Sequence, residues 1–291
     1  MITEGYLLRH CQGRPGGRGP AIIDIAQDHI LHYLSEQGFF DLGLSLKGGT
    51  ALRKFRAGNA GRFSTDLDFA GVSDALADLM IDAIDGARVG QFEFGTAPID
   101  GTRRMQLLIR SPFGDTEVPA RLDLGRRSLW LPPEQLPVLF LPIHGRYGFT
   151  LPSIPTARIE EVIAEKLARY RRGSLARDLY DLAWLAARPF DEVLARRLTV
   201  LKVWSDVLDD GLGVRPFDPE DVLRHRSADE FQPEAIGYLT TPVDVSSWIE
   251  VVRERFSFLR DLDEAEARYA RCSKADEWEV RQVVEALSSS A

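Results

Sequence analysis

The stretch LSLKGGTALRKFRAGNAGRFSTDLDF, residues 44–69, decides the fold of the chain. Residues 44–46 predict a short strand that enters the pair Gly48-Gly49, and residues 50–55 predict a short helix after that pair. Residues 65–69 (TDLDF) alternate polar and apolar side chains, as a half-buried strand does. The stretch therefore predicts a strand, a glycine turn, a helix and a second strand in close succession.

The glycine pair predicts a phosphate-binding turn. Gly48 and Gly49 let the backbone approach a ligand closely. The free N–H groups and the positive dipole end of the following helix favour a phosphate there. Thr50 is expected either to cap this helix or to contact a phosphate oxygen. Such a turn is a weak signal by itself and gains meaning from the acidic strand that follows it.

Two aspartates on the second strand are the main candidates for metal binding. Side chains two residues apart on a strand point to the same side, so Asp66 and Asp68 share one face. Leu67 and Phe69 share the other face. Carboxylates with Cα atoms roughly 6.6 Å apart raise each other's pKa unless a cation neutralises them, and magnesium prefers oxygen ligands. The alternative is that both acids face solvent on an edge strand.

A third carboxylate lies on another predicted strand, residues 117–124, within the sequence VPARLDL. Asp123 is flanked by Leu122 and Leu124, so its side chain points away from their face. If this strand neighbours residues 65–69, Asp123 can join the pair as a metal ligand and accept the proton of an attacking hydroxyl. A surface aspartate is the equally weighted alternative.

Two helices further along the chain carry the remaining candidates. Lys166 falls on the apolar stripe of a helix predicted over residues 156–172, where a lysine must snorkel or meet a partner. The functional hypothesis is that it reaches triphosphate oxygens. Asp178 lies at the edge of the apolar face of the next helix, residues 174–187, where it is placed to orient Lys166 or a ligand. Asp181 is expected to be a surface charge or a salt-bridge partner.

The order of elements predicts an α+β protein, with a mixed sheet and helices followed by a mainly helical C-terminal half. Residues 1–150 are expected to form the α/β catalytic domain and residues 151–291 the helical domain. Residues 11–20 are expected to be a loop, and residues 126–155 irregular with short strands. Further helices are predicted over residues 21–37, 74–85 and 190–207, and further strands over residues 91–95 and 103–110.

Composition bounds the class of protein. The chain has 291 residues with 44% hydrophobic and 27% charged side chains, which is typical of globular proteins. No apolar run approaches a membrane span and the N-terminus lacks a secretory pattern, so we expect a cytoplasmic protein. Cys11 and Cys272 belong to no metal-binding motif, which argues against zinc. The net charge of −8 is concentrated in residues 205–291, so the half with the chemistry is not acidic.

The succession KGGTAL, RFSTDLDF, LDL and EEVIAEKLARYRRGSLARDLYDL resembles the AbiEii/AbiGii family of bacterial nucleotidyltransferase toxins, including the MenT-type toxins. The resemblance covers residues 40–187. Its first two motifs are general to the DNA-polymerase-β-like nucleotidyltransferase superfamily, and the two helices at its end are typical of the toxin branch. The resemblance therefore implies a nucleotidyltransferase-type sheet.

The resemblance also implies an activity and its residues. A nucleoside monophosphate would pass from an NTP to an acceptor hydroxyl with release of pyrophosphate, and some family members extend the 3′ end of tRNA. The family's phosphate contacts match Gly48, Gly49 and Ser64, and its metal ligands match Asp66, Asp68 and, less securely, Asp123. Its later essential positions match Lys166 and Asp178.

The resemblance further implies magnesium, with manganese as an alternative, and a separate antitoxin protein. Two other hypotheses stay open at this point. One keeps the chemistry and changes the acceptor to a protein hydroxyl or a small molecule. The other is a non-catalytic nucleotide-binding module. The sequence does not indicate which NTP is used or how the chain assembles.

Overall fold

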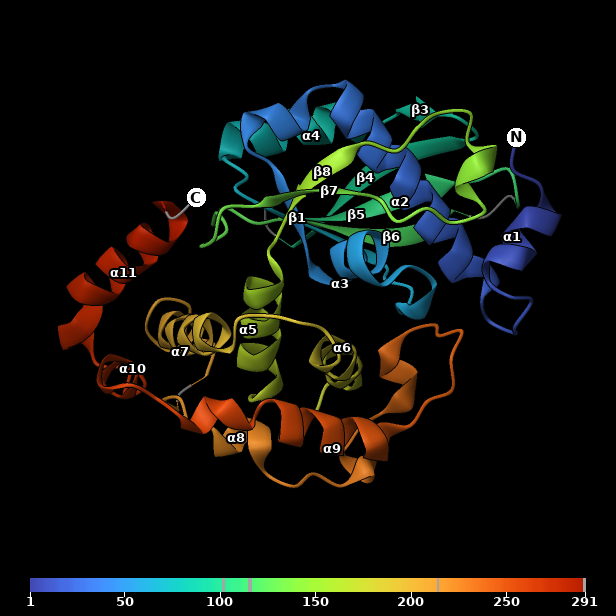
Figure 1. The fold of residues 1–291 in the computed structure, drawn as a ribbon. Helices are drawn as coiled ribbons and strands as arrows, with labels where there is room; N and C mark the ends of the chain where they lie inside the picture. Colours follow the sequence, from blue (N-terminus) through green and yellow to red (C-terminus); the bar gives the residue numbers. More distant parts are fainter. Residues whose placement is uncertain (101–102, 115–116, 214, 290–291) are drawn as a thin grey trace. The chain divides into compact units, whose positions relative to one another are not determined.

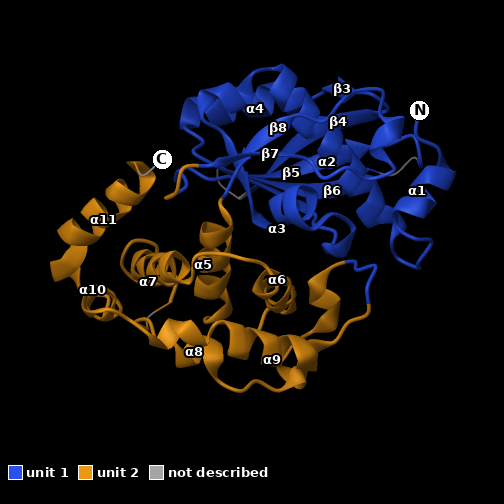
Figure 2. Cartoon of the chain, viewed as in Figure 1, with its two compact units in different colours: residues 1–129, 133–157, 238–241 blue, residues 130–132, 158–237, 242–291 orange. Residues whose placement is uncertain are grey.

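The computed structural model describes residues 1–100, 103–114, 117–213 and 215–289. The chain divides into two compact units (Figure 2). Unit 1 comprises Met1–Leu129, Pro133–Ala157 and Tyr238–Thr241, and unit 2 comprises Trp130–Pro132, Arg158–Gly237 and Pro242–Ala291. The principal crossing between units falls after Ala157. Two short segments, 130–132 and 238–241, belong to the unit opposite to their neighbours in the chain.

Unit 1 is built on one mixed sheet with the strand order β3-β4-β5-β6-β2-β1-β8-β7 (Figure 1). β2 runs parallel to β6 and antiparallel to β1, and β1 runs parallel to β8. This arrangement confirms the predicted mixed α/β fold class. The strands are β1 (Ser45–Lys47), β2 (Asp66–Ala70), β3 (Arg88–Val89), β4 (Phe92–Asp100), β5 (Arg104–Arg110), β6 (Val118–Leu124), β7 (Glu134–Pro137) and β8 (Ser153–Thr156).

One face of the sheet is buried in the main core of unit 1. Leu67, Leu107 and Leu122 on three neighbouring strands are fully buried in one cluster with apolar side chains of α2 (Arg18–Glu36) and α4 (Asp74–Ile84). The alternation of side chains along a strand then directs the intervening polar residues to the opposite face. Burial of the leucines therefore fixes which way the aspartates of β2 point.

The N-terminal segment is more helical than its composition predicts. A short helix, α1 (Glu4–His10), precedes the glycine-rich stretch, and α2 begins at Arg18, inside the predicted loop 11–20. Pro20 lies in the first turn of α2, where its missing N–H has no intrahelical partner to lose. The prediction of a loop over residues 11–20 is therefore wrong in its last three residues.

The short helix after the glycine pair also begins earlier than predicted. α3 (Gly48–Leu52) includes both glycines, and a π-helical turn, Arg53–Ala57, follows it directly. Unit 2 consists mainly of helices, as predicted for the C-terminal half. They are α5 (Ile159–Tyr170), α6 (Ala176–Ala186), α7 (Glu192–Leu208), α8 (Glu220–Leu223), α9 (Val245–Arg255), α10 (Glu264–Tyr269) and α11 (Glu277–Ser289). Among the described residues, none of the helices has the length and apolar character needed to cross a bilayer.

Candidate active site

Three carboxylates lie on two adjacent strands at the centre of the sheet. Asp66 and Asp68 are half-buried on β2, with Leu67 buried between them on the other face. β6 pairs with β2 in parallel, which places Asp123 beside Asp68 and Arg121 beside Asp66. β6 and β2 are adjacent, which meets the condition under which Asp123 can join the pair, and β2 is an interior strand rather than an edge strand.

The carboxyl of Asp123 is influenced by burial and by both acidic and basic neighbours. Burial raises the pKa of its carboxyl above the ordinary value, the charge of Asp66 raises it further, and Arg104 and Arg121 oppose the shift. Asp68 lies within hydrogen-bonding reach of Asp123. Oδ1 of Asp123 is buried without a hydrogen-bond partner. Two carboxylates in contact require a shared proton or a cation, so these side chains fit a divalent metal.

The described residues do not form a complete metal site by themselves. Over the part of the chain that the structure describes, no three His, Cys, Asp or Glu side chains are arranged to hold a metal ion. Magnesium is commonly bound by one or two carboxylates, with water and substrate phosphates filling the other positions. The pairs formed by Asp68 with Asp66 or Asp123 therefore match a site that a bound triphosphate completes.

The glycine turn lies directly against these carboxylates. Gly48 has a φ of +76°, which an L side chain rarely adopts, and a Cβ atom there would lie 2.0 Å from Oδ2 of Asp68. A Cβ atom at Gly49 would lie 2.5 Å from Nη2 of Arg62 and 3.0 Å from Oγ of Ser64. Glycine is thus required at position 48 for two reasons. The structure places four of the predicted site residues close together, as a single site would need: Gly48, Gly49, Ser64 and Asp68.

Thr50 has a different place from the one predicted. The N-cap residue of α3 is Lys47, and Thr50 is fully buried inside the helix. Its hydroxyl donates to the backbone carbonyl of Asp66 over 2.5 Å. Thr50 therefore does not cap the helix, and its hydroxyl ties α3 to β2 behind the turn. This hydrogen bond holds the glycine pair close to the aspartates.

Arg62 is a site residue that the sequence analysis missed. It is buried, and its guanidinium group faces Gly49 beside the hydroxyl of Ser64. An arginine in such a place supplies a planar set of donors that suits phosphate oxygens. The signal in the sequence was its position two residues before Ser64, within the motif RFSTDLDF.

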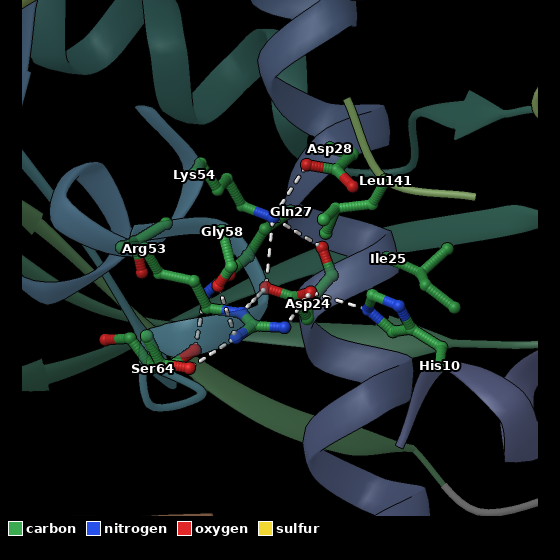
Figure 3. Close-up of polar contacts among 12 residues, drawn as sticks. His10, Asp24, Ile25, Gln27, Asp28, Arg53, Lys54, Gly58, Ser64 and Leu141 are labelled. Atoms are coloured by element: carbon green, nitrogen blue, oxygen red, sulfur yellow. Dashed lines mark hydrogen bonds and ion pairs between the residues drawn. The ribbon is translucent and has the colours of Figure 1, made fainter. Parts of the chain in front are cut away.

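A buried network of charges supports the loop that carries Arg62 (Figure 3). Nε and Nη2 of Arg53 donate to the carboxylate of Asp24 on α2, over 2.8 and 3.1 Å. Nη1 of Arg53 donates to the backbone carbonyl of Gly61 over 2.6 Å. Nζ of Lys54 donates to Oδ1 of Asp28 over 2.6 Å and to Oδ1 of Asp24 over 3.2 Å. Helix α2 is thereby joined to residues 58–61, which lead into β2.

The network also reaches the residues next to the carboxylates. Nε2 of Gln27 donates to the backbone carbonyl of Ser64 over 3.1 Å. Burial alone would raise the pKa of Asp24, but the charges of Arg53 and Lys54 and a hydrogen bond with His10 together hold it well below its ordinary value. Asp24 therefore stays ionised and keeps its hold on the loop at neutral pH.

The segment Tyr238–Thr241 anchors the same loop from far along the chain. The N–H of Phe63 donates to the carbonyl of Tyr238 over 2.9 Å. The hydroxyl of Thr240 donates to the carbonyl of Asn59 over 3.1 Å, and that of Tyr238 to the carbonyl of Cys11 over 2.6 Å. These hydrogen bonds explain why the segment belongs to unit 1.

The candidates on the two helices lie inside unit 2, where four charged side chains, three of them buried, form a cluster. Nζ of Lys166 donates to Oδ2 of Asp181 over 2.6 Å, and Oδ1 of Asp178 lies 3.8 Å away. Asp178 instead accepts from both Nε and Nη2 of Arg169, over 2.6 Å in the case of Nε. Lys166 does not snorkel, since it is 5% exposed. The closer partner of Lys166 is Asp181 rather than Asp178, and Asp181 is buried rather than on the surface.

Comparison with known proteins identifies this arrangement. The family described as "Nucleotidyl transferase AbiEii toxin, Type IV TA system" matches residues 32–279. The chain belongs to the AbiEii family of nucleotidyltransferase toxins. Among solved structures, this AbiEii toxin is similar to MenT4, a nucleotidyltransferase toxin from Mycobacterium tuberculosis H37Rv, with 48% sequence identity and a TM-score of 0.94. The similarity covers 99% of this chain and 100% of that one. No curated protein matches the chain.

Family membership confirms the resemblance drawn from the motifs. The AbiEii toxin is a nucleotidyltransferase of a type IV toxin–antitoxin system, a class that implies an NTP substrate and an antitoxin partner. Its mixed α/β fold is that of the MenT toxin. The carboxylates, the glycine turn and Arg62 are the parts of unit 1 whose chemistry suits nucleotidyl transfer.

Proposed function

We propose that this toxin transfers a nucleoside monophosphate from an NTP to a hydroxyl at the 3′ end of tRNA, with magnesium bound at Asp66, Asp68 and Asp123. The observation that carries the proposal is the position of these acids on two adjacent strands, directly against the Gly48-Gly49 turn. Phosphate-binding groups and metal-binding groups must meet in any enzyme of this kind. We expect the reaction to take place in the cytoplasm, where its substrates are.

The residues of unit 1 have separate tasks in the proposed reaction. Gly48, Gly49, Arg62 and Ser64 bind the phosphates of the NTP through donors that face the turn. When bound, the metal ion stabilises negative charge on the attacking and leaving oxygens. A bond forms between the acceptor oxygen and the α-phosphorus, while the bond from that phosphorus to the bridging oxygen breaks and pyrophosphate leaves. Asp123 accepts the hydroxyl proton as the general base.

Lys166 and Asp178 are proposed to be essential on the family resemblance alone. Within unit 2 they belong to the ion cluster with Asp181 and Arg169, and loss of Lys166 also leaves the buried Asp181 without its closest cation. Their effect on catalysis therefore has to be separated from their effect on stability.

The test is incubation of the toxin with magnesium, each labelled NTP in turn and total RNA. We expect label to appear in tRNA with the wild type. We expect Asp66→Ala to lose at least about 10²-fold in rate, because charge stabilisation by a metal contributes several kcal/mol and each factor of ten corresponds to about 1.4 kcal/mol. Equal transfer by Asp66→Ala, or no transfer to any acceptor, contradicts the proposal. Label that survives ribonuclease would indicate a protein or small-molecule acceptor instead.

A further inference from the structure

The sheet face that carries the carboxylates continues into two arginines on the neighbouring strands β6 and β5. Arg121 on β6 is the neighbour of Asp66, and Arg104 on β5 is the neighbour of Asp123. Both side chains alternate with buried residues of the core, so they share the outward face with the acids. Moving from β2 through β6 to β5, the outward face therefore changes from acidic to basic.

These two arginines are accessible. The side chain of Arg104 is 67% exposed, and Arg121 is also exposed. The ion pair of Arg104 with Asp123 is long, with 3.6 Å between Nε and Oδ1. By contrast, Arg110 at the other end of β5 is held by both Glu93 and Glu117, at 3.0 and 2.7 Å. A ligand phosphate can thus engage Arg104 without breaking a short ion pair.

The in-line geometry of the proposed transfer indicates a role for these two arginines. This inference rests on the proposed function. In a displacement at phosphorus, the attacking oxygen and the leaving group lie on opposite sides of the α-phosphorus. The glycine turn follows β1, on one side of the carboxylates of β2, and β6 and β5 lie on the other side. If pyrophosphate leaves at the turn, the acceptor hydroxyl must approach over β6 and β5.

We propose that Arg104 and Arg121 bind backbone phosphates of the acceptor RNA, next to the hydroxyl that is modified. A nucleic acid places a phosphate on every nucleotide, so phosphates necessarily precede a reactive 3′ hydroxyl. Arginine binds phosphate oxygens in a two-pronged geometry and is the favoured residue for this task. The chain as a whole carries a net charge of −8, so a polyanion needs such a local basic strip to approach the carboxylates.

The test compares Arg104→Gln and Arg121→Gln with Arg110→Gln as a matched control. Arg110 lies on the same strand and outward face as Arg104, roughly 20 Å along β5 at about 3.3 Å per residue. For each of the first two variants we expect the KM for RNA to rise about tenfold, as for loss of one charge-assisted hydrogen bond. The KM for NTP should stay the same. Arg110→Gln should change neither constant.

Two further measurements separate binding from chemistry. The affinity for a labelled RNA oligonucleotide, measured by fluorescence anisotropy without NTP or metal, should fall for Arg104→Gln and Arg121→Gln. The slope of log affinity against log salt should lessen by about 0.7 for each phosphate that the variant no longer binds. Arg104→Lys and Arg121→Lys should keep the salt slope and lose part of the affinity, because lysine keeps the charge without the two-pronged geometry.

The outcomes distinguish this inference from the proposed function. If the wild type labels RNA and the glutamine variants keep its KM for RNA and its salt slope, the inference is wrong and the proposed function stands. If the label enters protein, or if Arg110→Gln weakens RNA binding as much as the others, the inference is also wrong. If no acceptor is labelled, the proposed function fails first. A fall in melting temperature is not expected, since exposed ion pairs contribute little to stability.

Discussion

The proposed reaction needs the ionised carboxylate of Asp123, yet this ionised form destabilises the folded protein. Its carboxyl is partly buried beside two other acids, and its raised pKa means that the ionised form is penalised in the folded protein. An acid of this kind lowers stability at neutral pH and regains it as pH falls through the raised pKa. In the proposed reaction, this charge is retained because it binds the metal and accepts a proton.

We therefore expect Asp123→Asn to be more stable than the wild type and far less active. Removal of the charge ends the penalty, so the melting temperature should rise at about pH 7, and the difference should shrink as pH falls toward about 4. The rate of transfer should fall about 10²-fold, because a ligand and proton acceptor is lost. Thermal unfolding without metal across this pH range is the measurement. A difference that does not change with pH would contradict the assigned cause.

Gly48 is the second residue whose identity is dictated by the site. Gly48→Ala should lose most activity, because the new methyl group must displace the carboxylate of Asp68 and the backbone is left in a strained conformation. Such strain costs about 1–3 kcal/mol. Gly43→Ala is the control, since Gly43 has a φ of +89° with no atom within 4 Å of an added Cβ. Both variants should lose stability in urea unfolding, and only Gly48→Ala should lose its rate per folded molecule.

At the scale of elements, the helix pair α5–α6 holds a charge cluster that has two explanations. Lys166 and Asp181 form a buried ion pair, which can be structural, catalytic or both. Lys166→Met should cost about 3–5 kcal/mol, because Asp181 is left buried without its counter-charge. The double variant Lys166→Met with Asp181→Leu should recover most of that stability, since an apolar pair of similar volume replaces the ions.

Activity then decides between the two explanations. If Lys166 takes part in transfer, the double variant should be folded and inactive. Recovery of transfer together with stability would show that Lys166 is a structural residue and would remove it from the proposed reaction. Urea unfolding and labelled-NTP transfer, measured on the same preparations, give both answers.

The strands and helices also show which features of the fold can be predicted from the sequence. The period of two in residues 65–69 was sufficient to place Asp66 and Asp68 on one face, because the alternation of a strand is a local property. The role of Asp123 depends on the pairing of β2 with β6, and this pairing could not be predicted because no local signal tells which strands become neighbours. The helix boundary at Gly48 was missed because α3 continues without a break from the glycine turn.

At the scale of the whole molecule, the parts that sequence could not reveal are the long-range polar interactions. Arg53 and Lys54 look like ordinary surface charges of a short helix, and their partners Asp24 and Asp28 lie on a helix distant in sequence. The available signal was the spacing of the two aspartates, four residues apart within a helix of apolar residues. Asp178 was paired with Lys166 by its position on the helical face. Only the fold shows that Arg169 binds Asp178 and Asp181 binds Lys166.

The mixed fold and the family could be predicted from the motifs, because each motif is a short local pattern whose residue types indicate its chemistry. The exact division into two units could not be predicted from the sequence, because the composition of segments 130–132 and 238–241 does not show that they belong to the other unit. The hydrogen bond of Phe63 with Tyr238, for example, joins two residues of unit 1 that lie far apart in the sequence.

The return of residues 238–241 to unit 1 has a consequence for the toxin during its synthesis. A ribosome adds roughly 5–20 residues per second, so Tyr238 is synthesised about 9 to 35 seconds after Phe63. Until then, the loop that carries Arg62 lacks the hydrogen bonds that it makes with Tyr238 and Thr240. The nascent polypeptide thus cannot complete the hydrogen bonds around the proposed phosphate-binding turn before Tyr238 and Thr240 have been translated.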